Sequence, residues 1–581
     1  MIGTTLLFRI FLLYNMSLWY HIKKLKVRHI VTKLVTWHIK NAKILDVFNL
    51  KFDDTELWIN DNQILYRGKR SDLTAENTFD AGGGYIVPGL IDSHLHIESS
   101  LLTPSEFGKL VIPHGITRIF ADPHEIASVA GVSGIQYMLE DAKQTPLNIH
   151  YMLPSSVPAT PFEHAGATLH ADALKPFYSV PEVNGLAEVM DFPAVANLDP
   201  DMLQKIKDAE DAGRHVDGHA AGLTPEQLAV YRNVGIDTDH ESENAKEALE
   251  RLNAGFSIFV REGTVERDEK AILPAITMAN QSHFSFATDD KTANDIQSEG
   301  SIDYSVKLAI ENGMDPAIAF TIATYNAAQA HKLQNIGALT DGFVADLAVF
   351  DDLAHLETPK VMIGGHWYKD NQSIVTPLAN QSLNFSLTKS DIALPLQSDK
   401  PAHIINITPH HITTEHTVEE VPVEQGLFVA NETFAKIVVA ERYHNLGHGV
   451  GIIKGFNMRD GAIASTIAHD SHNVIIAGVN DDDMILAADT LHEIGGGQVV
   501  VNHGKITTLP LPIGGLMSDQ PFENVIKTNQ QLLQAFSEIS DVPFDPFLTL
   551  SFMALPVIPS LKITDQGLFD FEKFDFITVQ D

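Results

Sequence analysis

The feature that most constrains the fold is a regular alternation of short apolar segments and helix-length stretches between Gly89 and Leu333. The first apolar segment is GLIDSHLH, and seven more follow: GITRIFADPHE, LNIHYMLPSSVP, VNGLAEVMDF, RHVDGHAAGL, GIDTDHES, GFSIFVREGT and HFSFATDD. Helical stretches such as NAKEALERLNAG and ILPAITMANQ separate them and leave room for parallel crossovers. Strands alternating with helices over about 250 residues are typical of a (β/α)8 barrel. The sequence therefore predicts an α/β protein with a TIM-like (β/α)8 barrel over residues 89–334.

Strand-like sequence flanks this region on both sides. WHIKNAKILDVFN, TELWINDNQILYRG and NTFDAGGGYIVPGL precede it, and GALTDGFVADLAVFDDL and PKVMIGGHWYKD follow it. The simplest arrangement is one β-sandwich domain formed by residues 37–88 and 335–395, with the barrel inserted between them. Gly-rich turns in HNLGHGVGIIKGF and EIGGGQVVVNHGK predict a further C-terminal α/β domain over residues 396–581.

The first 36 residues differ in charge from the rest of the chain. Residues 1–40 carry seven Lys or Arg and no acid, whereas 75 acidic residues follow them. The apolar stretch TTLLFRIFLLY is short, contains Arg9, and lacks the flanking basic region and small-residue cleavage site of a signal peptide. We expect residues 1–36 to be an atypical N-terminal extension, with Met16 as an alternative start and with no membrane partner.

Charge and cysteine content limit the partners and the chemistry. The net charge is −35, so the field of the protein would repel a polyanion, and we expect no nucleic-acid partner. The chain has no cysteine, which leaves His, Asp and Glu to hold any metal ion. The lack of cysteine also fits a reducing cytoplasm, which is the location that we expect.

Ionisable residues follow the predicted strands where each strand ends, and catalytic groups of (β/α)8 barrels lie at this end. His94 and His96 are two residues apart, so on an extended backbone both imidazoles point to one side and can reach one metal ion. The other strand-end residues are Asp122, His124, Glu125, Glu188, His219, His240, Asp289 and Asp290. Each alone is more often a loop residue or a helix cap. Together they supply enough ligands for two divalent cations about 3.5–4 Å apart.

With these motifs the chain resembles the amidohydrolase superfamily and, within it, the bacterial adenine deaminases. The closer resemblance rests on GLIDSHLHIESS, ADPHEIA, GLAEVM, DGHAAGL, TDHE, REGT, ATDD and IAHDSHN, which span nearly everything from residue 37 onward. The absence of a lysine from NGLAEVMDF argues against the carbamylated-lysine branch of the superfamily.

The resemblance implies a role for six of the strand-end residues. The implied metal ligands are His94 and His96 for the first ion, His219 and His240 for the second, and Glu188 as the bridge. Asp289 is implied as a further ligand of the first ion and as the catalytic group that moves protons.

Strand two has more than one interpretation. His124 and Glu125 either bind an additional metal or support the site from the second shell, and an ordinary helix start in DPHEIAS has equal weight. Asp290 is expected to support Asp289, because neighbouring residues on a strand point in opposite directions.

Two other polar groups also have two interpretations each. Arg261 and Glu262, at the end of strand seven, either contact a purine or form a structural ion pair. His469 and His472, in IAHDSHN, either lie near substrate on a loop that reaches over the barrel mouth or belong to turns at a domain interface.

The reaction implied by the resemblance is hydrolytic deamination of adenine to hypoxanthine and ammonia by a metal-activated hydroxide, in purine salvage. Mn²⁺ is the metal implied, and Fe²⁺ or Zn²⁺ would also accept these His and carboxylate ligands. Alternatives are an amidohydrolase acting on cytosine, guanine or a lactam, a non-catalytic barrel scaffold, and a protein that binds nucleic acid or membrane through its basic N-terminus. We expect a homo-oligomer, a dimer or larger, that takes adenine as its small-molecule substrate.

Overall fold

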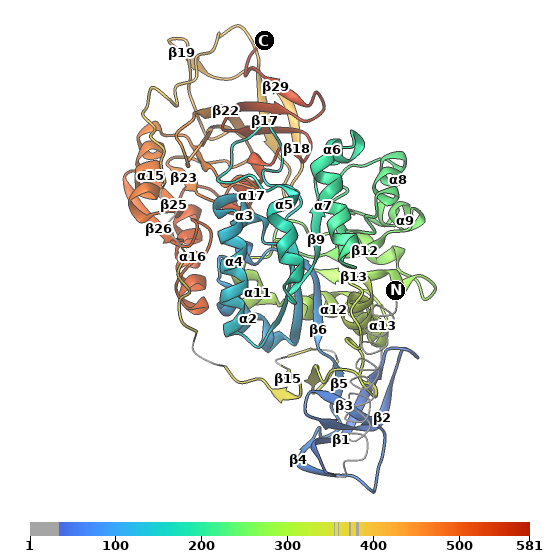
Figure 1. Cartoon of the computed structure of the whole chain (residues 1–581). Helices are drawn as coiled ribbons and strands as arrows, with labels where there is room; N and C mark the ends of the chain where they lie inside the picture. The colour runs from blue at the N-terminus through green and yellow to red at the C-terminus, as the bar shows by residue number, and fades with distance from the viewer. Residues whose placement is uncertain (1–33, 354, 358, 371–372, 379–382) are drawn as a thin grey trace, which may run out of the picture.

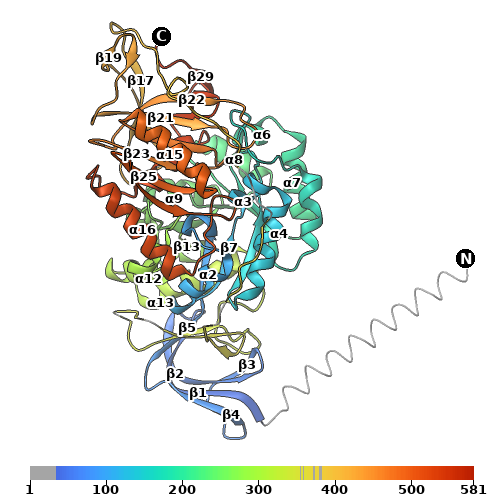
Figure 2. The same cartoon turned by 90° about the vertical axis from the view of Figure 1, so that its left-hand side faces the viewer.

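The computed structural model describes residues 34–353, 355–357, 359–370, 373–378 and 383–581. Most of the expected extension, residues 1–33, therefore lies outside the described residues. A β-sheet forms one end of the molecule, parallel strands wrapped by helices form the middle, and the C-terminal part packs along the other side (Figures 1 and 2).

Strands from both flanks of the central region join in one sheet. Its order is β16-β15-β14-β5-β1-β2-β3, with β4 paired to β1, and β14 runs antiparallel to β5. The strands are β1 (Leu34–Asp46), β2 (Lys51–Asn60), β3 (Gln63–Arg67), β4 (Thr74–Asp80), β5 (Tyr85–Pro88), β14 (Leu347–Phe350), β15 (Lys360–Ile363) and β16 (His366–Trp367). β1 begins three residues before the predicted boundary, and its Val35 is buried against Trp58 and Leu73. The chain therefore leaves this sheet at Pro88, forms the central region, and returns to it.

Each of the eight predicted apolar segments contains one parallel strand. These strands are β6 (Leu90–Leu95), β7 (Ile116–Ala121), β8 (Asn148–Leu153), β9 (Val183–Val189), β10 (His215–Gly218), β11 (Thr238–Asp239), β12 (Ser257–Arg261) and β13 (Phe284–Ala287). Hydrogen bonds join five of these strands in one sheet of order β10-β9-β8-β7-β6. They join the other three in a second sheet of order β11-β12-β13. A parallel bridge between Leu95 and Asp289 links the end of β6 to the end of β13. Among the described residues no ladder joins β10 to β11, so the predicted barrel is confirmed as a curled parallel α/β sheet and not as a closed ring.

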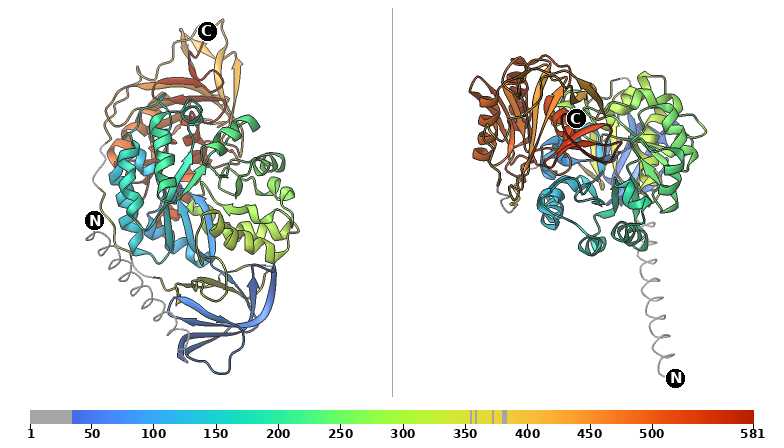
Figure 3. Two further views of the ribbon diagram at one scale, coloured as in Figure 1. Left: turned by 45° about the vertical axis from the view of Figure 1, so that its right-hand side comes forward. Right: turned by 90° about the horizontal axis from the view of Figure 1, so that it is seen from above.

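Helices surround these strands on the outside (Figure 3). They are α2 (Pro104–Val111), α3 (His124–Ala130), α4 (Val132–Asp141), α5 (Ala171–Leu174), α6 (Phe192–Ala196), α7 (Pro200–Asp211), α8 (Pro225–Asn233), α9 (Ala245–Asn253), α10 (Glu269–Ile272), α11 (Ala293–Glu299), α12 (Ile302–Glu311), α13 (Pro316–Thr321) and α14 (Ala327–Ala330). Several begin at side-chain caps, such as Thr224 in a capping box at the start of α8. Among the described residues, no helix has the length and apolar character needed to cross a membrane.

The C-terminal part is built on a second eight-stranded sheet of order β18-β17-β22-β21-β24-β23-β25-β26. Its strands are β17 (Ala402–Ile407), β18 (Thr414–Glu419), β21 (Phe434–Ala440), β22 (His448–Lys454), β23 (Ala462–Ser465), β24 (Val474–Gly478), β25 (Gly497–Asn502) and β26 (Lys505–Pro510). Smaller sheets pair β19 (Val423–Glu424) with β20 (Leu427–Phe428), and β27 (Leu561–Thr564) with β28 (Gly567–Asp570) and β29 (Asp575–Ile577). Leu387 and Ile392 pack into the core beneath α15 (Asp481–Ile494), so this part recruits residues before the predicted boundary at 396.

Two C-terminal helices bring this part against the central strands. α16 (Phe522–Ser537) packs on α2 and α11, and α17 (Pro546–Ser551) continues into a short turn of helix at Phe552. Phe552 and Leu555 line a cavity that also contains the strand-end histidines. The C-terminal part therefore covers the carboxyl ends of the parallel strands.

Candidate metal centre

Six strand-end side chains meet at the carboxyl ends of the parallel strands, and all six are buried. They are His94, His96, Glu188, His219, His240 and Asp289. Five of them, all but His94, line one cavity with a volume of about 340 Å³. Because β6, β9, β10, β11 and β13 all end at the same side, residues up to 195 positions apart in sequence lie within one cluster.

Glu188 lies between two pairs of imidazoles. Its Oε2 is 2.7 Å from Nδ1 of His219 and 3.1 Å from Nε2 of His240. Its Oε1 is 3.4 Å from Nε2 of His96 and 4.0 Å from Nε2 of His94. Each carboxylate oxygen therefore faces one pair, which is the position that a bridging ligand between two ions would take.

Asp289 closes the first pair from the opposite strand. Its Oδ1 is 3.3 Å from Nε2 of His96 and 3.8 Å from Nε2 of His94. The backbone of Asp289 has φ 54°, in the left-handed region, and its N–H donates to the carbonyl of His94. Strained backbone of this kind is common at functional sites, where surrounding contacts hold one side chain in a fixed position.

Arg261 is held by three carboxylates. Its Nη1 donates to Glu241 and lies 3.3 Å from Oδ2 of Asp289, while its Nε donates to Asp268 at 2.9 Å. Arg261 therefore braces Asp289, and it forms ion pairs with Glu241, Asp268 and Asp289 rather than with Glu262. The carboxylate of Glu262 instead accepts from the backbone N–H of Glu269 at 3.3 Å, outside the group of residues that line the cavity.

Two buried carboxylates orient histidines, one on His94 within the cluster and one on His124 beside it, and sequence reasoning overlooked the first carboxylate. Asp217 Oδ2 lies 3.1 Å from Nδ1 of His94, and Asp122 Oδ2 lies 2.8 Å from Nδ1 of His124. Carboxylates that hold one ring nitrogen of a histidine commonly fix the other nitrogen toward a metal. Asp217 lies in DGHAAGL, two residues before His219. A carboxylate inside a predicted buried strand needs a partner, and this feature of the sequence could have pointed to it.

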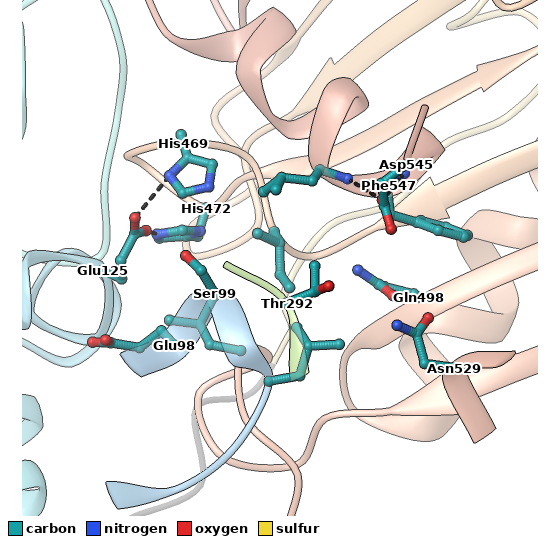
Figure 4. Close-up of a pocket in the computed structure, with 14 residues that line it drawn as sticks. Glu98, Ser99, Glu125, Thr292, His469, His472, Gln498, Asn529, Asp545 and Phe547 are labelled. Carbon is teal, nitrogen blue, oxygen red and sulfur yellow. Dashed lines mark hydrogen bonds and ion pairs between the residues drawn. The ribbon is translucent and has the colours of Figure 1, made fainter. Parts of the chain in front are cut away.

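The IAHDSHN loop after β23 reaches the strand-two residues. His469 and His472 both face the carboxylate of Glu125, which leads the first turn of α3 (Figure 4). Asp470, a residue that the sequence analysis did not single out, has its Oδ1 3.5 Å from Nε2 of His124. The side chain of Asp290 accepts from the hydroxyl of Ser99, and Asp290 lines the same cavity as Asp289.

The donor set suits divalent cations. Nε2 of His94, which faces Asp289, is buried and has no hydrogen-bond partner. Burial lowers the pKa of His240, but the hydrogen bond and negative charge of Glu188 outweigh it and raise that pKa to about 10. Mixed imidazole and carboxylate donors within 4.8 Å of one another are the ligands that Mn²⁺, Fe²⁺ or Zn²⁺ would take.

A curled parallel α/β sheet whose strand ends gather His, Glu and Asp around one cavity defines a metal-dependent hydrolase of the amidohydrolase type. The Amidohydrolase family model matches residues 85–376, and the Adenine deaminase C-terminal domain model matches residues 411–575. The chain belongs to the amidohydrolase family and, within it, to the adenine deaminases.

Similar proteins support this membership over almost the whole chain. The adenine deaminase of Leuconostoc citreum is 74% identical over 95% of this chain and 100% of its own length. Adenine deaminase 1 of Oenococcus oeni is 65% identical over 94% of this chain and 99% of its own. The adenine deaminase of Lactiplantibacillus plantarum is 46% identical over 94% of this chain and 98% of its own.

Proposed function

We propose that this chain hydrolyses adenine to hypoxanthine and ammonia in purine salvage. The observation that carries the proposal is the position of Glu188 between two histidine pairs, in a chain whose full-length relatives are adenine deaminases. We assign His94, His96 and Asp289 to one divalent cation, His219 and His240 to a second, and Glu188 to both. Mn²⁺ is our first choice of metal, with Fe²⁺ or Zn²⁺ as alternatives.

Two divalent cations, when bound, lower the pKa of water enough to make it a nucleophile near neutral pH. Residues of this chain would accept the proton of that water and keep bulk water out of the cavity. Asp289, whose Oδ1 faces the first histidine pair and whose Oδ2 is held by Arg261, would help to hold the first cation, and its carboxylate would take up the proton of that water. Met190, Ile412, Phe552 and Leu555 line the same cavity and exclude bulk water from it.

The fold expected from the sequence is part of the proposal. We propose that the two parallel sheets act as one (β/α)8 barrel over residues 89–334, flanked by the β-sandwich of residues 37–88 and 335–395 and the C-terminal domain of residues 396–581. A cytoplasmic location and a homo-oligomer remain predictions, and light scattering coupled to size-exclusion chromatography tests the second.

The deciding experiment compares kcat/KM for adenine, adenosine, AMP, cytosine and guanine on one Mn²⁺-loaded preparation, with ammonia release as the readout. We expect adenine to exceed the other substrates by a factor of order 10⁴, as for sites that hydrogen-bond a substrate edge. Equal turnover of cytosine or adenosine would contradict adenine deamination and favour another amidohydrolase activity.

A further inference from the structure

A second group of metal-type donors lies where the C-terminal part meets the parallel strands. We call it the interdomain cluster, and it consists of His124 and Glu125 at the start of α3 and His469 and Asp470 in the loop after β23. The exposed fractions of these four side chains are all 3% or less. Figure 4 shows Glu125 and His469 facing each other across this contact.

Four donor atoms of the interdomain cluster converge. Nε2 of His124 lies 3.3 Å from Oε1 of Glu125 and 3.5 Å from Oδ1 of Asp470. Nδ1 of His469 lies 2.7 Å from the same Glu125 oxygen and 3.6 Å from the same Asp470 oxygen. Ligands about 2.1 Å from one ion in tetrahedral geometry lie about 3.4 Å from one another. The spacing of the cluster is therefore that of a coordination shell.

Hydrogen bonds among these groups do not account for the arrangement. Nε2 of His124 is buried and lacks any partner in hydrogen-bond geometry, whereas the carboxylate oxygens of Glu125 form ion pairs with His469 and His472. Leaving such a nitrogen unsatisfied in the interior costs about 1–3 kcal/mol. An ion at the centre of the cluster would satisfy it.

Neighbouring residues hold the donors in the state that a metal requires. Asp122 engages Nδ1 of His124, which leaves Nε2 free of a proton, as in carboxylate–histidine–metal arrangements. His472 contacts the other oxygen of Glu125, and Phe552 stacks on the ring of His469 at 4.8 Å between centroids. All four donors also line the cavity of the metal centre, and a second cavity, lined in part by Glu125, His469 and His472, adjoins them.

We propose that the interdomain cluster binds a third divalent transition-metal ion, separate from the two assigned to the metal centre. Two imidazoles and two carboxylates favour Mn²⁺, Fe²⁺ or Zn²⁺ over Mg²⁺ or Ca²⁺. The barrel supplies two of the ligands and the C-terminal part supplies the other two. Such an ion ties the C-terminal part across the mouth of the metal centre.

The test measures metal content and position. The full-length protein is reconstituted with Mn²⁺, dialysed, and analysed by mass spectrometry of the metal per chain. We expect His469→Ala to bind one equivalent less than the wild type, and Asp470→Asn, a milder change, to lose the same equivalent. The matched control is His503→Ala, an exposed histidine of the same domain, which should retain the wild-type content.

Anomalous diffraction at the manganese edge locates the ions in wild-type crystals and does not depend on the folding of any variant. A peak among His124, Glu125, His469 and Asp470 is expected. Because the readout is a difference of one equivalent and a peak at a stated place, it is independent of which substrate the enzyme takes. The proposal is overturned if no peak appears there, or if folded His469→Ala binds as much metal as the wild type.

Discussion

Asp217 Oδ2 lies 3.1 Å from Nδ1 of His94, and both side chains are buried. An ionised carboxylate can only accept, so this contact places the proton of His94 on Nδ1 and leaves Nε2 as an unprotonated donor facing Asp289. Burial would raise the pKa of Asp217, but the hydrogen bond from His94 and the nearby histidine charges hold it below its ordinary value. Asp217 is thus a positioning residue for the metal centre.

Replacing Asp217 tests this role. Asp217→Asn can present an amide N–H to His94 and permit the other tautomer, so we expect metal affinity to fall by about 10–100-fold. A chelator titration of the Mn²⁺-loaded protein measures the affinity, and kcat should recover at saturating Mn²⁺. Asp211→Asn, at an exposed position of α7, is the control. Unchanged metal retention in Asp217→Asn would show that the carboxylate does not position His94.

The bridging position of Glu188 predicts a stronger effect. Glu188→Gln removes the only carboxylate placed between both histidine pairs among the described residues, and His94→Ala removes a donor from one pair. We expect both variants to lose bound metal. We expect kcat to fall by more than about 100-fold, which is the upper end of the loss typical when a residue that only hydrogen-bonds to a metal ligand is replaced. Metal analysis and ammonia release provide the readouts, with exposed Glu182→Gln as the control. Full turnover by metal-free protein would refute the metal requirement.

Arg261 should matter for stability as well as for the site. Arg261→Met leaves Glu241, Asp268 and Asp289 without their shared cation in the interior. Breaking a buried pair in this way costs about 3–5 kcal/mol, so the thermal unfolding midpoint should drop clearly. Arg459→Met breaks an exposed pair with Asp541 and should cost at most about 1 kcal/mol. Circular dichroism measures the unfolding midpoints. Similar midpoints for the two variants would argue against a stabilising role of Arg261 among the three carboxylates.

Lys562 predicts a pH dependence away from the metal centre. Burial lowers the pKa of Lys562 to about 7, and its Nζ donates to the carbonyls of Ile412 and Phe552. In the unfolded chain a lysine titrates near 10.4, so between about pH 7 and 10 the unfolded state binds more protons and stability rises with pH. The slope from this group is at most about 1.4 kcal/mol per pH unit.

The comparison with Lys562→Met isolates this contribution. The difference in unfolding midpoint, wild type minus Lys562→Met, should increase between pH 7 and 9, because methionine carries no proton to lose. Lys505→Met, at an exposed position, should show no such trend relative to the wild type. A difference that stays constant with pH would mean that Lys562 remains charged in the folded protein.

Truncation at the N-terminus should be tolerated. A chain that starts at Met16 retains β1 from Leu34 onward together with the buried contacts of Val35, so we expect kcat/KM within about twofold of the full chain. A truncation that begins at Thr36 removes Val35 and serves as the contrast, with lower stability expected. Insolubility of the Met16 chain would show that the first residues contribute to the fold.

The sequence by itself determined where the parallel strands lie and which residues end them. All eight predicted segments contain a strand, and the period of two in His94 and His96 correctly placed both imidazoles on one side. These features could be predicted because apolar runs and strand periodicity are local, and because the ends of parallel strands meet at one side whatever the helices between them. The resemblance of motifs then supplied the family, which the comparisons confirm.

Only the tertiary structure decided which side chains face one another. Asp217 and Glu241 read as ordinary residues in DGHAAGL and TDHE, yet one orients His94 and the other holds Arg261. Glu262 carries the same chemistry as its neighbour in REGT but points away from the cavity. The contact of His469 with Glu125 joins segments 344 residues apart, and no local pattern encodes it. Pairing of buried charges depends on the packing of distant strands and on the desolvation that follows, and both exist only once the chain has folded.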